Sequence, residues 1–166
     1  VFRPIELNYE CSPLYTGGGD NALVDGRLGS QDFRDGTWQA KQGQDMVATV
    51  DLGFSATITG LETGVYLYQD AWIFQPESIL WEGSLDGTHW FPMAKHGPSA
   101  VLKRDDRQIR LKVEGPLNGQ PRKARYIRMT ATNAGACPGW HAAAGSESWL
   151  FLDEMVVEAK PSAPAL

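Results

Sequence analysis

Apolar and polar residues alternate with a period of two along most of this chain. The alternation is clear at residues 46–53, "MVATVDLG", and at residues 56–68, "ATITGLETGVYLY". A period of two places successive side chains on opposite faces of an extended strand, whereas a helix needs apolar residues three or four apart. Gly, Pro, Asn and Asp separate the segments, as turn residues do. The predicted strands are residues 46–53, 56–68, 77–87, 108–115, 124–133 and 148–159.

The connections between these strands are rich in turn residues and poor in helical patterns, with a short turn at residues 20–24 as the one plausible exception. Strands without crossover helices are typical of an antiparallel β-sandwich and not of a parallel α/β sheet. The length of 166 residues suits one domain. We therefore predict an all-β domain at residues 1–159, followed by a Pro- and Ala-rich linker or tail at residues 160–166.

The charge balance disfavours polyanionic partners. The chain has 15 Lys and Arg against 20 Asp and Glu, a net charge of -5, and the basic residues form no obvious cluster in the sequence. Because phosphate groups are bound by clustered basic residues, we expect neither nucleic acid nor an anionic membrane as a partner. No apolar run approaches the roughly 20 residues that span a bilayer, and residues 1–10 lack a signal-peptide core. We expect a soluble domain cut from a longer protein.

The two cysteines, Cys11 and Cys137, do not have the spacing of metal ligands. Two separate thiols are the favoured interpretation. A disulfide that ties the N-terminal region to the last long loop stays open.

No group of residues indicates catalysis. The three histidines lie in predicted loops without ligand spacing, at His89, His96 and His141. Asp153 and Glu154 are adjacent in a predicted strand, so their side chains should point to opposite faces and form no carboxylate pair. We therefore expect no enzymatic activity.

Several local motifs together resemble one known family. In chain order they are "ALVDGRLGS", "DGTWQ", "ATVDLG", "WIFQPESILWEGSLDGTHW", "ARYIRMTATNAG" and "WLFLDEMVV". This order is similar to that of coagulation factor 5/8 type C (discoidin-like) domains, a fold that also serves the family 32 carbohydrate-binding modules. The resemblance covers about residues 8–158 and implies a discoidin-like jelly-roll β-sandwich of about eight antiparallel strands. Residues 133–154 look more particularly like the C-terminal domain of bacterial family 20 β-hexosaminidases.

The resemblance implies one structural calcium ion, held by the loop at residues 22–30 and by the last strand. The implied ligands are the carbonyl oxygens of Ala22, Arg27 and Asp153, the side chains of Asp25 and Glu154, and the carbonyl or hydroxyl of Ser30. Calcium prefers six to eight hard oxygen ligands, and such a loop with two carboxylates can supply them. Because Asp-Gly is also a strong turn signal, an Asp25-Gly26 turn without a metal stays open.

The resemblance also implies a carbohydrate site in loops at one end of the sandwich. The candidate residues are Gln39, Gln42, Tyr68, Gln69, Asp70, Trp72, Trp140 and His141. Aromatic rings can stack on the apolar face of a sugar, while amides and carboxylates bind its hydroxyl groups. The His and Arg typical of galactose-binding relatives have no counterpart here, so the identity of the sugar stays open.

Other aromatic residues are expected in the core. Trp38, Trp81, Trp90 and Trp149 lie in strand-like patterns, and Phe74 precedes a strand. Trp140 lies in a Pro-Gly loop and is the tryptophan most expected to be exposed.

The sequence thus predicts a non-catalytic carbohydrate-binding accessory module of a bacterial secreted glycoside hydrolase, similar to a β-hexosaminidase. We expect it in the periplasm, at the cell surface or outside the cell. Its expected partners are glycans of N-acetylhexosamine or galactose type and the catalytic domain of the parent enzyme, without membrane insertion. Two alternatives stay open: a domain that packs against its catalytic partner without a ligand, and a cell-adhesion or phospholipid-binding discoidin domain.

Overall fold

Eight antiparallel strands and two short 3-10 helices form the part of the chain that the structure, a computed structural model, describes: residues 1–98 and 103–161. The strands are β1 (Ile5–Leu7), β2 (Gln39–Gln42), β3 (Met46–Leu67), β4 (Ser78–Ser84), β5 (Phe91–His96), β6 (Ile109–Glu114), β7 (Lys123–Thr132) and β8 (Trp149–Pro161). The 3-10 helices are η1 (Ala22–Val24) and η2 (Gln69–Ala71). The predicted all-β jelly-roll sandwich of about eight antiparallel strands is confirmed.

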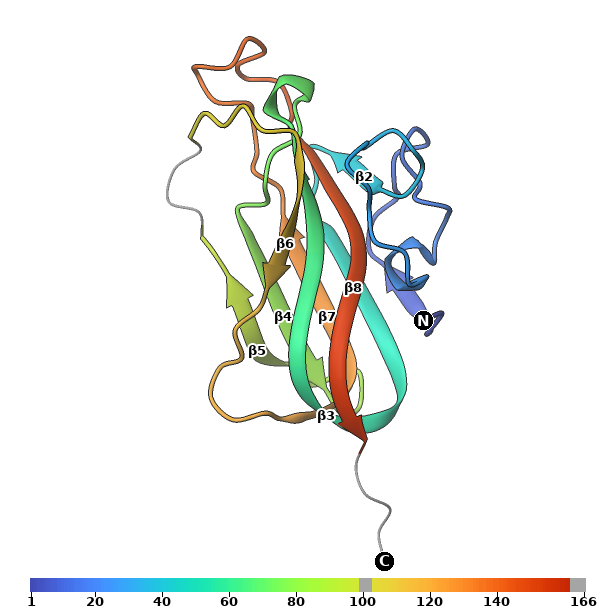
Figure 1. Cartoon of the computed structure of the whole chain (residues 1–166). Coiled ribbons are helices and arrows are strands. Elements are labelled where there is room, and N and C mark those ends of the chain that lie inside the picture. The colour runs from blue at the N-terminus through green and yellow to red at the C-terminus, as the bar shows by residue number, and fades with distance from the viewer. Residues whose placement is uncertain (99–102, 162–166) are drawn as a thin grey trace, which may run out of the picture.

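Strand β3 connects the two layers of the sandwich. Its first half pairs with β1 and β7, and its second half pairs with β6 and β8. The register of β3 against β7 shifts between Asp51 and Ala56, where the strand passes from one layer to the other. Figure 1 shows β6, β3 and β8 in front of β5, β4 and β7. One long strand therefore replaces the two strands predicted at residues 46–53 and 56–68.

The remaining strand predictions differ from the structure mainly at their ends. Strand β8 continues to Pro161, beyond the predicted end of the domain at residue 159, and residues 162–166 lie outside the described part of the chain. The short strands β1, β2 and β5 were not predicted, because three to six residues carry too little alternation to be recognised.

The alternating residues of β3 explain the position of the core. Met46, Ala48 and Val50 are buried, while the intervening Val47 and Thr49 are half-buried. Burial of such side chains is the main favourable contribution to folding. The core continues between the two layers through β4, β7 and β8.

The expected core aromatics divide into two groups. Trp38 and Trp81 are buried as predicted, and so is Phe74. Trp90 and Trp149 are only half-buried, so their assignment to the core was wrong. Both lie at the ends of the sandwich, where the layers no longer cover an outward-facing ring.

Asp153 and Glu154 do not follow the alternation expected for a regular strand. The pairing of β8 with β3 shifts register between Thr63 and Val65, which leaves both acidic residues opposite Gly64. Such a bulge inserts one extra residue and redirects its side chain. Both carboxylates accept hydrogen bonds from the loop at residues 22–30. The regular strand geometry on which the prediction of opposite faces rested therefore does not hold at these two residues.

The carboxylate of Asp153 joins four segments of the chain. One oxygen accepts a hydrogen bond from the backbone N–H of Gly64, and the other accepts one from the N–H of Gly29, both at 2.8 Å. Arg110 on β6 donates from Nε at 2.6 Å, and the Asp153 side chain is fully buried. A Cβ atom at position 64 would lie 2.3 Å from this carboxylate, which explains the glycine there.

Two further findings concern membrane-spanning helices and the cysteine thiols. Neither 3-10 helix in the described residues has the length or the apolar character to span a bilayer. Cys11 and Cys137 are both free, as the favoured interpretation predicted, and Cys137 is buried.

Removing the partner of Asp153 should destabilise the fold strongly. In an Arg110→Met variant the buried carboxylate keeps its backbone donors but loses its counter-charge, so we expect the free energy of unfolding to fall by about 3 kcal/mol. Urea denaturation measures this change. Arg107→Met is the matched control, because Arg107 also pairs with an aspartate but lies on the surface; it should cost much less. Equal losses in the two variants would contradict the proposed role of burial.

Candidate functional site

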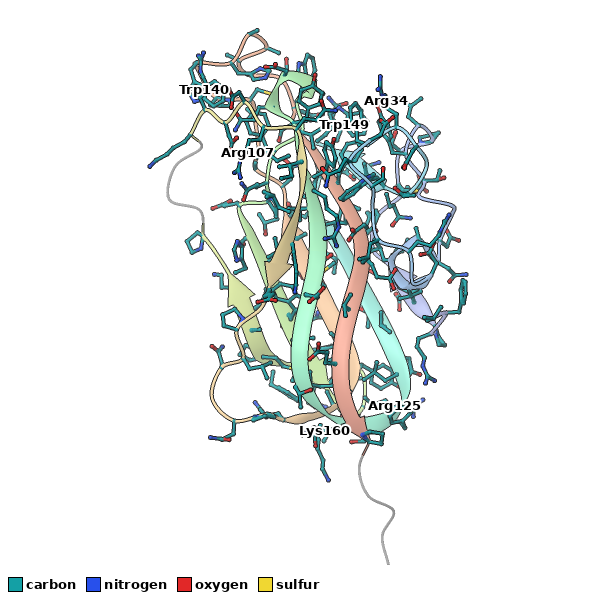
Figure 2. All side chains as sticks on the ribbon, in the orientation of Figure 1. Arg34, Arg107, Arg125, Trp140, Trp149 and Lys160 are labelled. Atoms are coloured by element: carbon teal, nitrogen blue, oxygen red, sulfur yellow. The ribbon has the colours of Figure 1, made fainter. Side chains whose placement is uncertain are left out.

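Four half-buried aromatic rings gather at the end of the sandwich that carries β2 and η2. We call Tyr15, Phe33, Tyr68 and Trp149 the aromatic platform. The ring centroids of Tyr15 and Trp149 are 5.3 Å apart. The ring centroid of Phe33 lies 6.0 Å from that of Tyr15 and also 6.0 Å from that of Tyr68. Figure 2 shows Trp149 at this end of the molecule, with Arg34 close to the same end. Phe151 is buried beneath the platform, with its ring centroid 4.8 Å from that of Tyr15.

The platform leaves polar atoms available to a ligand. Among residues 1–98 and 103–161, no hydrogen-bond partner lies within reach of the hydroxyl groups of Tyr15 and Tyr68 or of the indole N–H of Trp149. Half-buried rings with unpaired polar edges can stack on a sugar and also bind its hydroxyl groups.

The two predicted glutamines on β2 have different environments. Gln42 is half-buried and lies directly opposite Trp149 in the β2–β8 pair, so both side chains share one face. Gln39 is fully buried. Its amide donates to the carbonyl oxygens of Thr16 and Gly19, and its oxygen accepts a hydrogen bond from Tyr9. Gln42 therefore borders the platform, whereas Gln39 has no surface to offer a ligand.

Four predicted residues form a tight turn at η2: Gln69 and Asp70 lie in the helix, and Tyr68 and Trp72 flank it. Tyr68 belongs to the platform, Asp70 is exposed, and Trp72 is half-buried with a positive φ of 66°. A positive φ is unusual for a residue with a side chain, and such strain is often found at binding sites. The backbone carbonyl of Trp72 accepts a hydrogen bond from the N–H of Trp149 at 2.7 Å, which fixes the turn beside the platform.

Gln69 serves as a structural brace. Its side-chain amide donates to the carbonyl oxygen of Lys103, and its side-chain oxygen accepts from the N–H of Asp105, both at 2.8 Å. The side chain of His141 accepts from the N–H of Ala143 at Nδ1, so Nε2 carries the proton and donates to the Gln69 carbonyl. Both predicted site residues thus hold loops together and leave no free polar atom for a sugar.

Trp140 lies on the other side of η2 from the platform. It is half-buried, with its ring centroid 6.3 Å from that of Phe74. The guanidinium carbon of Arg104 lies 5.1 Å from the ring centroid, and Arg104 also donates to the Trp140 carbonyl. The Trp140 side chain is thus half-buried and contacts Arg104, whereas its position in a Pro-Gly loop predicts an exposed ring.

Asp25 and Glu154 are the two carboxylates that the family resemblance assigns to a metal. One oxygen of Glu154 accepts a hydrogen bond from the N–H of Gly26 at 3.1 Å, and the other is buried with no partner in the described residues. Burial raises the pKa of Glu154 to about 7, and the charges of Asp25 and Asp153 act in the same direction. A buried, partnerless carboxylate oxygen beside a second carboxylate fits a bound cation, and hard oxygen donors fit Ca²⁺.

Among the other implied metal ligands, Asp153 lies on β8, while Ala22, Arg27 and Ser30 lie in the same loop as Asp25. The carbonyl oxygen of Arg27 accepts no hydrogen bond from the residues that the structure describes, and Ala22 lies in η1 against β8. Both oxygens of Ser30 already take part in hydrogen bonds. Its carbonyl accepts one from the indole N–H of Trp38, and its hydroxyl bonds the backbone of Asp32. No cluster of three or more His, Cys, Asp or Glu side chains occurs in residues 1–98 and 103–161, so backbone oxygens would have to complete a calcium shell.

The Asp25-Gly26 turn also exists without a metal. Asp25 accepts a hydrogen bond from the N–H of Arg27 at 2.8 Å and pairs with the Arg27 guanidinium, while Gly26 has a φ of 83°. These are the features of an Asp-Gly turn. The turn therefore shapes this loop without a metal ion, and a bound ion would stabilise it further.

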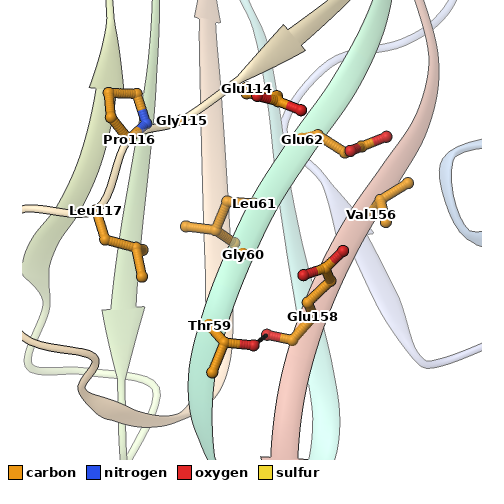
Figure 3. A pocket seen from close by; sticks show the side chains of 10 residues that line it. All are labelled: Thr59, Gly60, Leu61, Glu62, Glu114, Gly115, Pro116, Leu117, Val156 and Glu158. Carbon is orange, nitrogen blue, oxygen red and sulfur yellow. Dashed lines mark hydrogen bonds between the residues drawn. The ribbon is translucent and has the colours of Figure 1, made fainter.

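A groove of about 560 Å³ lies elsewhere, on the outer face of β3 and β8 (Figure 3). Three carboxylates border it, those of Glu62, Glu114 and Glu158, and Lys112 pairs with the first two. None of the predicted site residues lines the groove.

Sequence reasoning missed three members of the platform. Tyr15 and Phe33 lie in irregular segments without periodicity, and Trp149 begins a strand whose pattern favours the core. One feature of the sequence could have revealed the platform, namely the pair Trp149 and Phe151. These residues are two positions apart in a predicted strand, so their rings lie on the same face of β8.

Comparisons with known proteins place this geometry in context. The sequence matches the family described as F5/8 type C domain over residues 9–150. It matches none of the curated proteins with which it was compared. The fold is similar to the C-terminal domain of a chitobiase from Bacteroides fragilis, at 16% identity, 96% and 95% coverage of the two chains and a TM-score of 0.51.

Two further solved structures share the fold. A Streptococcus pneumoniae fucose binding module has 17% identity, coverages of 96% and 92% and a TM-score of 0.53. A family 32 carbohydrate-binding module from Clostridium perfringens, solved in complex with GalNAc-β-1,3-galactose, has 14% identity, coverages of 93% and 93% and a TM-score of 0.50.

The raised pKa of Glu154 predicts a specific pH dependence in the presence of a chelator. Between pH 4.5 and 7 the unfolded chain loses this proton while the folded chain retains it, so stability should fall as pH rises, by about 3 kcal/mol over the window. Denaturation curves at several pH values measure the slope. A Glu154→Gln variant should lack this slope, and an unchanged slope in the variant would assign it to another group.

Proposed function

The chain belongs to the F5/8 type C domain family, and from this membership and the aromatic platform we propose that its loop end binds carbohydrate. F5/8 type C domains are non-catalytic modules, and this domain is accordingly not an enzyme. Its contribution to a larger protein is therefore recognition.

The aromatic platform is the observation that carries the proposal. A pyranose ring has an apolar face, which an aromatic ring can cover, and a rim of hydroxyl groups, which need hydrogen-bond partners. Tyr15 and Trp149 supply the aromatic rings at this end, and the polar atoms at the edges of these rings can form hydrogen bonds with the hydroxyl groups of the sugar. Gln42 and Asp70 border the same end and add an amide and a carboxylate.

Similarity of fold gives weaker support for the ligand class. Two structures with the same fold are described as a fucose binding module and as a module in complex with GalNAc-β-1,3-galactose. At 17% and 14% identity these likenesses concern the fold alone. We therefore propose N-acetylhexosamine- or galactose-type glycans as the first ligands to test.

We propose that the parent protein is a secreted bacterial glycoside hydrolase, similar to a β-hexosaminidase. A weak sugar contact is useful in such a protein, because tethering makes the second binding event intramolecular and raises the effective substrate concentration. The protein would then act in the periplasm, at the cell surface or outside the cell. The likeness to a chitobiase C-terminal domain supports this context.

Loss of the platform tryptophan should weaken sugar binding. We expect a dissociation constant of roughly 10⁻⁴ to 10⁻³ M for the wild type, because a small hydrated ligand buries little surface. Trp149→Ala removes one stacking ring and should weaken binding about tenfold. Titration calorimetry with N-acetylglucosamine, N-acetylgalactosamine and galactose measures this.

Trp90→Ala is the matched control. Trp90 is equally half-buried, stacks under Arg128 at the far end of the sandwich and should leave sugar binding unchanged. Trp140→Ala tests the alternative ring beyond η2. If Trp140→Ala alone abolishes binding, the site lies there and not on the platform. If the wild type binds none of the sugars, a domain that only packs against its catalytic partner becomes the better interpretation.

We also propose that one structural calcium ion binds between the loop at residues 22–30 and β8. Asp25 and Glu154 would supply the two carboxylates, and backbone oxygens of Ala22, Arg27 and Asp153 would join them, with Ser30 as a further candidate. The support is the buried, partnerless oxygen of Glu154. A bound cation would offset the repulsion between these carboxylates and fasten the loop to the last strand.

Calcium should raise the melting temperature of the wild type. At a concentration 100 times the dissociation constant, a ligand specific for the folded state adds about 2.7 kcal/mol. Asp25→Ala should abolish this calcium-dependent shift. Asp35→Ala is the matched control, because Asp35 begins the other Asp-Gly pair of this region and should lower stability without removing the shift. A calcium response that survives in Asp25→Ala would refute the site.

A further inference from the structure

Basic residues gather at the end of the sandwich opposite the aromatic platform. Figure 2 shows Arg125 and Lys160 at this lower end, and Trp140 and Trp149 at the upper end. The chain as a whole carries a net charge of -5. A local excess of positive charge on such a chain is created by the fold, because the residues come from distant segments.

Two lysines of this end stand in one row of the sheet. Lys123 on β7 and Lys160 on β8 both lie directly opposite Thr57 of β3. Directly opposite residues of paired strands point to the same face. The neighbouring row, formed by Ala56 and Ala124, is buried, so the lysine row faces solvent. With two strand spacings between them, the lysine backbones are about 10 Å apart.

Arg122 directly precedes Lys123, and Arg3 lines a pocket together with Ala159, the residue before Lys160. Each of these two arginines stacks on an aromatic ring. The guanidinium carbon of Arg122 lies 3.7 Å from the ring centroid of Phe91, and that of Arg3 lies 5.3 Å from the ring centroid of Phe54. Stacking holds a guanidinium flat while its N–H groups stay free at the edges. Phe54 is itself 42% exposed.

In the part of the chain that the structure describes, these four cations lie apart from any carboxylate. Within residues 1–98 and 103–161, none of Arg3, Arg122, Lys123 and Lys160 has a carboxylate oxygen within 4.0 Å. We call these four residues the basic end.

The acidic residues nearby are few and mostly engaged. Arg125 binds both oxygens of Asp51, at 2.9 and 3.0 Å, and these bonds, with a smaller effect of Arg3, lower the pKa of Asp51. Asp86 is bound by backbone N–H groups of its own turn and by His89. Glu158, two residues before Lys160, borders the acidic groove.

We propose that the basic end is a second binding surface, for a linear polysaccharide that carries carboxylate or sulfate groups. The row of lysines would bind anionic groups on successive sugars, and the flat guanidinium groups would each bind one carboxylate or sulfate through paired N–H donors. The exposed ring of Phe54 offers an apolar surface to a sugar ring beside Arg3.

Other polyanions fit this surface less well. Nucleic acid carries a negative charge about every 1.7 Å, so closely spaced phosphates would meet Glu158 and Asp51 as well as the four cations. A membrane surface favours a broad basic face with protruding apolar tips. The exposed apolar residues near Arg3 are Val1, Phe2 and Phe54, and vesicle binding is the measurement that distinguishes a membrane from a polysaccharide. A polysaccharide with spaced charges can follow the cations and avoid the carboxylates.

Polyanion binding by the 166-residue chain tests the proposal. We expect polygalacturonate, which carries carboxylates, or heparin, which carries sulfates, to bind at low salt and to be released at high salt. Whichever of the two binds identifies the anionic group. The double variant Lys123→Ser and Lys160→Ser should bind about tenfold more weakly, because it loses the two central charges.

The double variant Lys95→Ser and Lys103→Ser is the matched control. It removes the same net charge from exposed lysines elsewhere on the surface, and it should retain binding. Trp149→Ala should also retain polyanion binding, which separates this surface from the proposed sugar site. Equal weakening in both lysine double variants would overturn the proposal. So would tighter binding to phosphatidylglycerol vesicles or to a single-stranded oligonucleotide than to either polysaccharide, or no binding at all.

Discussion

The buried carboxylate of Asp153 is the interaction on which the rest of this structure depends. It binds the N–H groups of Gly29 and Gly64 and the guanidinium of Arg110, and so joins an early loop, β3, β6 and β8 at one point. A buried charge is costly unless its hydrogen bonds are satisfied, so these segments can adopt few other arrangements. The bulge in β8 that turns Asp153 inward also brings Glu154 to the same loop.

The loop end is organised by a second set of polar contacts. Gln69 and His141 connect η2 to two neighbouring loops through their side chains, and therefore support the aromatic platform without belonging to it. The aromatic platform rests in turn on buried Tyr66 and Phe151. A rigid base matters for a weak ligand, because a preordered surface loses little entropy on binding.

The two ends of the sandwich differ in chemistry. Considering the described residues alone, the upper end presents aromatic rings with unpaired polar edges, and the lower end presents cations without anionic partners. A module with these two surfaces can contact a neutral part and a charged part of one polysaccharide. Each surface alone would be weak, but binding at one raises the effective concentration at the other.

The sequence by itself determined the all-β class, most of the long strands and the burial of Trp81, because alternation over seven or more residues is a local signal of burial. Only the tertiary structure decided what the candidate residues do. Gln39 is buried because β2 lies under an early loop, and Trp149 is half-exposed because β8 begins at the edge of the layers. The basic end has no trace in the sequence, since Lys123 and Lys160 come into one row only when β7 and β8 both pair with β3. Periodicity reports which face of a strand is apolar, whereas contacts between distant segments depend on register, bulges and strand ends, which no local pattern encodes.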